Sequence, residues 1–263
     1  MNAQKKTKMA TYKKRGAKKS QATPNQPLVD QDSTTAEVFE TLDVTASKTE
    51  AWVGKYQNII LTLIGVIAVG VLGYLGYNRY VVEPKAEEAV SELNQAQYYF
   101  ELAVNSVQSD SLFLRALNGG EGKYGFLDII DNYKGTPAAT LATYGAGMSY
   151  LHLKQYENAI TYLDKFNADD ILLSALSKGA IGDAFAEIGQ LEDAYDYYMK
   201  AAATNNNLFS TPKYLFKAAM VGADLGKTKQ ALALLERIKN EFPQSPEMSM
   251  VEVQIGRLET LNQ

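Results

Sequence analysis

The sequence predicts an all-α protein in which a single N-terminal transmembrane helix is followed by an α-solenoid of helical hairpins. Two observations carry this prediction. One run of 19 residues, Ile59 to Tyr77, contains no charged residue and no proline. After this run, small residues followed by large apolar ones recur at intervals of 34 to 37 residues, a period typical of repeat proteins built from helical hairpins.

The apolar run has the length of a transmembrane helix. As a helix it would be about 28 Å long, close to the ~30 Å thickness of the bilayer hydrocarbon. It starts too far from the N-terminus to be a secretory signal peptide. We place the transmembrane helix at residues 58–78 and expect it to remain attached.

Three glycines spaced three residues apart form a candidate partner face on this helix: Gly70, Gly73 and Gly76. Small residues allow a second membrane helix to approach closely. Glycine is also common in membrane helices that have no partner, so both interpretations stay open.

Charge predicts the orientation of the chain. Residues 1–20 contain eight Lys and Arg residues and no acid, whereas residues 84–263 contain 23 acidic and 15 basic residues. Because cytoplasmic flanks of membrane helices are enriched in Lys and Arg, we expect a cytoplasmic N-terminus. The C-terminal domain then lies outside the cytoplasm, which is the periplasm for a protein of a Gram-negative inner membrane.

Two segments precede the membrane helix. Residues 1–33 have almost no bulky apolar side chains and predict a disordered basic cytoplasmic tail; this tail could attract membrane lipid or, weakly, ribosomal RNA, or remain solvated. Residues 34–57 predict an amphipathic juxtamembrane helix, with a capping box at Thr34 and Glu37. Trp52 and Tyr56 fall where interfacial aromatic residues belong.

Residues 84–263 predict one helical domain. Pro84 is placed to restart a helix after the membrane, over residues 85–108, and a shorter helix follows at 110–117. The glycine-rich segment 118–122 predicts a turn. Asp170 is expected to cap a later helix.

The repeat is anchored by small residues, each followed four positions later by a large apolar one. These anchors are Gly125, Ala159, Ala194 and Ala231. Twelve and nine residues before an anchor stand a small residue and an aromatic one: Gly147 and Tyr150, then Gly182 and Phe185. The last unit departs from the pattern with Ala219 and Gly222.

These spacings resemble the tetratricopeptide repeat over residues 125–245, with a cap helix expected at 246–261. The resemblance implies that Gly147, Tyr150, Ala159, Gly182, Phe185, Ala194 and Ala231 pack the hairpins. It also implies that the first helix of each hairpin lines a protein-binding groove. The candidate groove residues are Tyr144, Met148, His152, Asp183, Glu187, Phe216, Met220 and Asp224. Alternatively, Tyr144, Met148, Phe216 and Met220 pack beneath neighbouring helices.

No catalytic or metal-binding constellation is found. The chain has no cysteine and one histidine, His152, which excludes cysteine nucleophiles, thiolate metal sites and two-histidine metal sites. Carboxylate pairs such as Asp169–Asp170 have no accompanying base and nucleophile. We therefore expect a protein that is not an enzyme and needs no cofactor or metal.

The order of a short N-terminal segment, one membrane helix and a domain of helical hairpins resembles the YfgM-like family over residues 36–261. Members of that family are ancillary subunits of the bacterial Sec translocon. The segment AEEAVSELNQAQYYFELA resembles the first domain helix of that family, and the long basic tail resembles Bacteroidota-type members. The resemblance implies as partners the Sec channel subunits, a membrane-anchored periplasmic chaperone and client polypeptides. The alternative function is a structural scaffold in another envelope assembly or secretion machine.

Overall fold

The computed structural model describes residues 34–107 and 109–261, and every regular element in this part of the chain is helical. This confirms the predicted all-α class. The chain divides into two compact units, Met1–Val69 and Gly70–Gln263. Helix α1 (Thr34–Tyr77) provides the described part of the first unit and begins the second. The predicted tail, residues 1–33, lies outside the described residues.

Helix α1 contains the candidate membrane span. It runs without interruption through position 57, where the juxtamembrane helix was predicted to end. Of the helices that the structure describes, one is long and apolar enough to cross a membrane. Its most apolar 18-residue stretch is not buried against any other part of the described chain. Ile59, Val66 and Leu72 are each exposed. An exposed surface of this kind is costly in water and suits hydrocarbon.

The chain remains helical beyond residue 78, where the transmembrane helix was predicted to end. A π-helical turn, η1 (Asn78–Val82), connects α1 to α2 (Glu83–Val104). Pro84 lacks an amide hydrogen, and its ring would collide with the carbonyl four residues earlier in a regular α-helix. We infer that the wider turn accommodates this proline, so the chain stays helical where a new helix start was predicted.

Three helices form the first layer of the domain: α2, α3 (Asp110–Asn118) and α4 (Phe126–Asn132). Their core includes Leu93, Phe126 and Ile129, all buried. Positive φ angles at Gly119, Glu121 and Gly122 form the predicted turn between α3 and α4. Glycine adopts such angles without strain.

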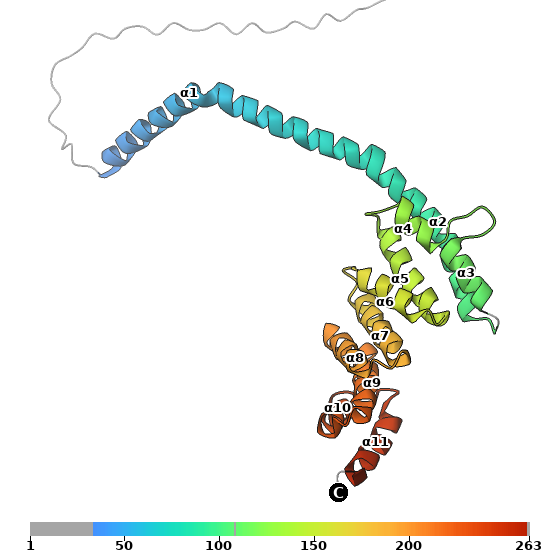
Figure 1. The fold of residues 1–263 in the computed structure, drawn as a ribbon. Helices are drawn as coiled ribbons and strands as arrows, with labels where there is room; N and C mark the ends of the chain where they lie inside the picture. Colours follow the sequence, from blue (N-terminus) through green and yellow to red (C-terminus); the bar gives the residue numbers. More distant parts are fainter. Residues whose placement is uncertain (1–33, 108, 262–263) are drawn as a thin grey trace, which may run out of the picture. The chain divides into compact units, whose positions relative to one another are not determined.

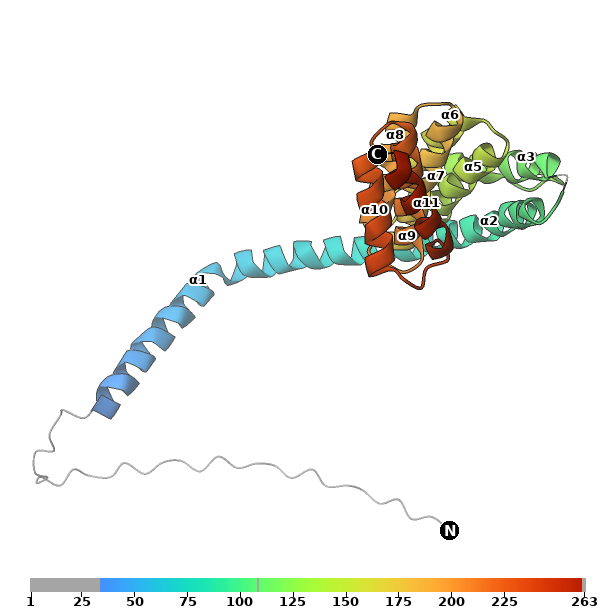
Figure 2. The ribbon, with the colours of Figure 1, turned by 90° about the horizontal axis from the view of Figure 1, so that it is seen from below.

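Three helical hairpins and a final helix follow this layer, and each hairpin packs on the next (Figure 1). We call them hairpins 1, 2 and 3. They are α5 (Pro137–His152) with α6 (Tyr156–Lys165), α7 (Ile171–Glu187) with α8 (Leu191–Thr204), and α9 (Ser210–Asp224) with α10 (Thr228–Glu241). The last helix, α11 (Met248–Leu261), packs on α10 (Figure 2). The Asp170 carboxylate accepts from Leu173 N at 2.9 Å, which confirms the predicted cap of α7.

Small residues allow the two helices of each hairpin to cross closely. A Cβ added to Gly147 would lie 2.5 Å from Leu163 Cγ, and one added to Gly182 would lie 2.7 Å from the Tyr198 ring. Ala159, Ala194 and Ala231, each the fourth residue of its helix, are fully buried. The crossings therefore leave no room for a larger side chain.

Aromatic pairs pack beside these crossings. The rings of Tyr150 and Tyr162 stack with centroids 5.3 Å apart, and those of Phe185 and Tyr197 are 5.4 Å apart. Hairpin 3 has Gly222 at the equivalent position. A Cβ there would lie 3.1 Å from the Tyr195 ring, so a tyrosine of the preceding helix takes the place of the missing aromatic residue.

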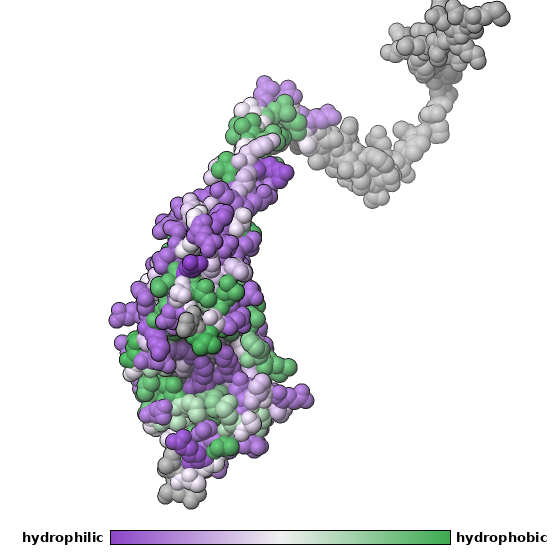
Figure 3. Space-filling view, turned by 90° about the vertical axis from the view of Figure 1, so that its right-hand side faces the viewer, coloured by the Kyte–Doolittle hydropathy of each residue, from purple (hydrophilic) through white to green (hydrophobic). Residues whose placement is uncertain are grey.

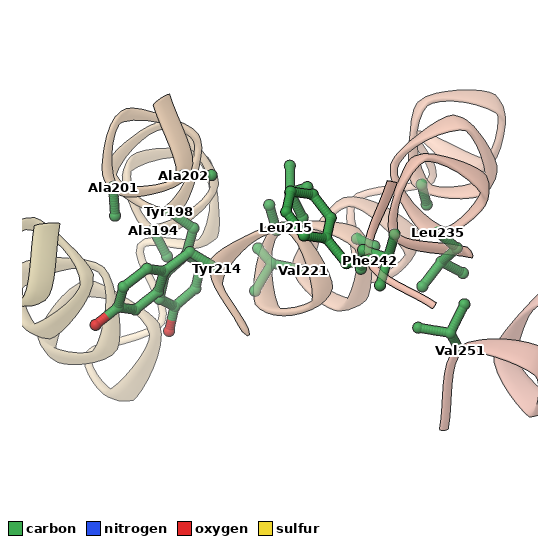
Figure 4. Close-up of a cluster of buried hydrophobic side chains, with 14 of the residues drawn as sticks. Ala194, Tyr198, Ala201, Ala202, Tyr214, Leu215, Val221, Leu235, Phe242 and Val251 are labelled. Atoms are coloured by element: carbon green, nitrogen blue, oxygen red, sulfur yellow. The ribbon is translucent and has the colours of Figure 1, made fainter. Parts of the chain in front are cut away.

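The largest core cluster joins hairpins 2 and 3 to α11. Its buried side chains include Leu215 of α9, Leu235 of α10, Phe242 directly after α10, and Val251 of α11 (Figure 4). This cluster closes the C-terminal end of the solenoid, where residues 246–261 were expected to form a cap.

The predicted anchor Gly125 is wrong as a hairpin residue. It precedes α4 with an extended backbone, and a Cβ there would lie 2.3 Å from Leu117 O. The fourth residue of α4 is Ile129, which is fully buried. The fourth helical position of α4 therefore falls four residues after the predicted anchor. Gly125 is small because loop backbone approaches it closely, and it does not lie at a helix crossing.

Replacing Gly147 with leucine should lower the free energy of unfolding by about 1–3 kcal/mol, because overpacking a tight crossing forces the helices apart. The measurement is chemical denaturation of the full chain. The matched control is Gly256→Leu on α11, where an added Cβ meets nothing within 4 Å. Equal stability of the two variants would contradict the crossing.

Candidate protein-binding groove

A depression of about 540 Å³ opens beside helix α7, and we call it the α7 depression. Charged and apolar side chains share its wall. It is lined by Leu151, His152, Lys154, Tyr156, Asp183, Ala186, Glu187, Tyr198 and Lys217. Hydrophilic and hydrophobic side chains also lie next to each other on the face of the solenoid seen in Figure 3. Such a mixed surface is typical of protein interfaces.

Three of the eight predicted groove residues line this depression: His152, Asp183 and Glu187. The others lie elsewhere. Tyr144 and Met148 are partly buried against the core between hairpins 1 and 2, and the Tyr144 ring lies 5.3 Å from that of Phe166.

The remaining three belong to hairpin 3. Phe216 and Met220 are partly buried against the largest core cluster. Asp224 is exposed at the end of α9. For the four apolar and aromatic candidates, the structure favours the alternative in which they pack beneath neighbouring helices.

His152 ends α5 and contacts the first layer of the domain. Its ring stacks on Phe113 of α3, with centroids 4.6 Å apart and planes 9° apart. Partial burial lowers the pKa of His152 below its usual value, which favours the neutral imidazole, and the ring presents an aromatic surface. The sequence carried no signal of this contact, because α3 lies outside the repeats.

Asp183 joins three helices of two hairpins at the wall of the depression. Its carboxylate accepts from Tyr198 Oη of α8 at 2.6 Å and from Lys217 Nζ of α9 at 2.5 Å. The Lys217 ammonium also lies 5.5 Å from the centroid of the Tyr198 ring. This polar cluster connects hairpin 2 to hairpin 3.

Tyr214 packs beside the same cluster. Its ring stacks on that of Tyr198, with centroids 6.4 Å apart (Figure 4). A Cβ added to Gly179 would lie 2.0 Å from the Tyr214 ring. Gly179 therefore provides the space into which a tyrosine of the next hairpin packs against α7.

The charged and tyrosine residues of the depression that the sequence did not predict are Lys154, Tyr156, Tyr198 and Lys217. Lys217 follows Asp183 by 34 residues, about one repeat, and this spacing of opposite charges was the available signal. Tyr156 Oη donates to Glu187 at 3.1 Å across hairpins 1 and 2. Both contacts depend on how the hairpins pack together.

The glycine face of α1 is open in this single chain. A Cβ added to Gly70, Gly73 or Gly76 would meet nothing within 4 Å. Among the described residues, no group of three or more His, Asp or Glu residues is arranged to hold a metal ion.

Comparison with known families identifies two segments of the chain. The tetratricopeptide repeat model matches residues 141–169 and 214–245, which cover most of hairpins 1 and 3. Hairpin 2 lies between the two matched segments. No curated protein matches the chain.

The polar cluster can be tested by a double-mutant cycle. Asp183→Ala leaves the half-buried Lys217 ammonium and the Tyr198 hydroxyl without their acceptor, so it should cost about 1–2 kcal/mol of unfolding free energy. Lys217→Met alone should cost less, and the double variant should recover part of the Asp183→Ala loss. Additive effects in denaturation experiments would show that the pair does not couple the hairpins.

Alkaline pH should destabilise the domain through its buried tyrosines. Burial, followed by the nearby Asp183 carboxylate, raises the pKa of Tyr198 and of Tyr214, and burial raises that of Tyr133 to about 12. Unfolded tyrosine ionises near pH 10. The stabilisation is therefore complete below about pH 10 and declines as the pH rises towards and beyond 12.

The free energy of unfolding, measured between pH 9 and 12, should fall less steeply for Tyr214→Phe than for the unmodified chain. Tyr98→Phe, at an exposed position on α2, is the control and should leave the slope unchanged. The same slope in all three proteins would exclude Tyr214 as a source of the alkaline loss.

Proposed function

We propose that this chain, two segments of which match the tetratricopeptide repeat model, is a non-enzymatic, membrane-anchored protein-interaction subunit. Helix α1 anchors it in a bacterial inner membrane, and the solenoid faces the periplasm and binds protein segments. The observation that carries this proposal is the α7 depression, whose mixed polar and apolar wall is built from tandem hairpins.

Anchoring in the membrane explains how a shallow surface can bind its partners well enough for function. A binding site held at a membrane meets partners in the same membrane at high effective concentration, so modest affinity suffices. A depression of about 540 Å³ that is open to solvent fits a few side chains of a partner. We therefore propose transient binding of polypeptide segments.

The proposed partners are those of the Sec translocon. In this proposal Gly70, Gly73 and Gly76 contact a channel subunit within the membrane, because these glycines leave room for a second helix. The solenoid receives emerging client polypeptides or recruits a membrane-anchored periplasmic chaperone. The basic tail, residues 1–33, remains on the cytoplasmic side near anionic lipid. The support is the resemblance in organisation together with the open glycine face.

In-cell photo-crosslinking tests this proposal. A photoreactive amino acid is placed at Gly73 of α1, at Ala186 in the α7 depression, or at the exposed Lys229 of α10 as the control. We expect Sec channel subunits from Gly73, and nascent chains or a chaperone from Ala186 but not from Lys229.

Crosslinks to other proteins would change the proposed function. Crosslinks from Gly73 and Ala186 to components of a different envelope machine alone would contradict the translocon and establish the scaffold function. Identical adducts from Ala186 and Lys229 would exclude the α7 depression as the binding surface.

A further inference from the structure

The three hairpins have the same turn between their two helices. In each, the amide that follows the left-handed residue donates to a carbonyl five residues earlier: Gln155 N to Tyr150 O, Gln190 N to Phe185 O, and Lys227 N to Gly222 O. The left-handed residues are Lys154, Gly189 and Gly226, with φ of 59°, 79° and 75°. This helix ending favours glycine at the left-handed position.

Lys154 is therefore the exception among the three turns. An L-amino acid with a side chain is strained at positive φ, whereas glycine is not. The hydrogen bonds of the turn are made equally well by the glycines of hairpins 2 and 3. The turn does not need a lysine, and strain of this kind points to a role for the side chain.

The Lys154 side chain lies where two depressions meet. It lines the α7 depression and also an adjoining one of about 370 Å³, together with Gln155, Tyr156 and Ile188. Ile188 and the neighbouring Leu151 and Ala186 add apolar surface. A bound chain crossing from one depression to the other would pass Lys154.

The charge of Lys154 is not used within the described part of the chain, where its ammonium makes no ion pair. The nearby Asp183 carboxylate is held by Lys217 and Tyr198. Glu187 accepts from Tyr156.

Glu157, which lines the adjoining depression, lies in the first turn of α6, where the helix dipole stabilises its negative charge. The lysine is thus the cation that remains available to a ligand. His152, whose ring stacks on Phe113, adds an aromatic wall.

We propose that Lys154 binds a carboxylate of the polypeptide in the α7 depression, so that the preferred partner segment has an acidic residue next to a large apolar one. The apolar neighbour packs on Leu151, Ala186 and Ile188 while the carboxylate accepts from the Lys154 ammonium, a charge-assisted hydrogen bond. This inference rests on the proposed binding of polypeptides by the solenoid.

Stability measurements test whether the Lys154 backbone is strained in its turn. Lys154→Gly should raise the unfolding midpoint of the full chain by roughly 2–4 °C, because it relieves the positive φ. Gly189→Lys, which places a lysine in the equivalent turn of hairpin 2 with no atom within 4 Å of its Cβ, should lower the midpoint by a similar amount. A lysine stabilised simply by the end of the preceding helix would give the opposite signs and overturn the inference.

Binding measurements test whether Lys154 binds a carboxylate of a polypeptide. The probe is the fluorescein-labelled, C-terminally amidated peptide Gly-Ser-Leu-Phe-Glu-Leu-Ser-Gly, compared with versions carrying Gln or Lys in place of Glu. Titration uses the full chain in nanodiscs of uncharged lipid. The Glu peptide should bind about fivefold more tightly than the Gln peptide. Lys154→Arg should preserve this preference and Lys154→Gly should abolish it.

The outcomes separate this inference from the proposed function. Equal binding of the Glu and Gln peptides would overturn the role of Lys154 while leaving polypeptide binding intact. Preference for the Lys peptide, or no binding of any peptide at millimolar concentration, would also overturn the inference. A Glu preference that depends on Lys154, in a protein that does not crosslink to the Sec channel, would uphold this inference and refute the translocon assignment.

Discussion

The close crossing of paired helices is the constraint on which the rest of the domain depends. Where Gly147 and Gly182 face Leu163 and Tyr198, these two side chains lie so close to the glycine backbone that a Cβ would collide with them. Because each crossing fixes the position of its two helices, it also fixes the ends of those helices. The turns at Lys154 and Gly189, and the wall between them, follow from these crossings. The candidate binding surface is therefore a product of the packing, although Gly147, Gly182 and the alanines opposite them do not themselves line the α7 depression.

The junction between hairpins 2 and 3 combines apolar packing with an ion pair. The largest core cluster spans this junction, and Asp183, which accepts from Tyr198 within hairpin 2, also accepts from Lys217 of hairpin 3. A hydrogen-bonded ion pair has stricter geometry than apolar packing, so it can set the angle between successive hairpins. The same residues form part of the α7 depression, which links the relative position of the hairpins to the shape of the surface offered to a partner.

The sequence predicted the local features of this protein well and the contacts between repeats poorly. The apolar run, the anchors Ala159, Ala194 and Ala231 and the Asp170 cap depend on residue type and spacing along one or two helices. The stacking of His152 on Phe113 and the pairing of Asp183 with Lys217 depend on how separate elements pack, which periodicity does not determine. Gly125 misled the alignment because a small residue serves equally for a helix crossing and for a tight loop.

The proposed function requires that α1 cross a membrane and hold the solenoid outside the cytoplasm. Because the chain contains no cysteine, single cysteines introduced at Ser20 and at the exposed Lys229 can each be tested with a membrane-impermeant maleimide. We expect Lys229→Cys to be labelled in intact cells and Ser20→Cys to be labelled only after the inner membrane has been disrupted. Labelling of Ser20→Cys in intact cells with protection of Lys229→Cys, or protection of both, would contradict the proposed function.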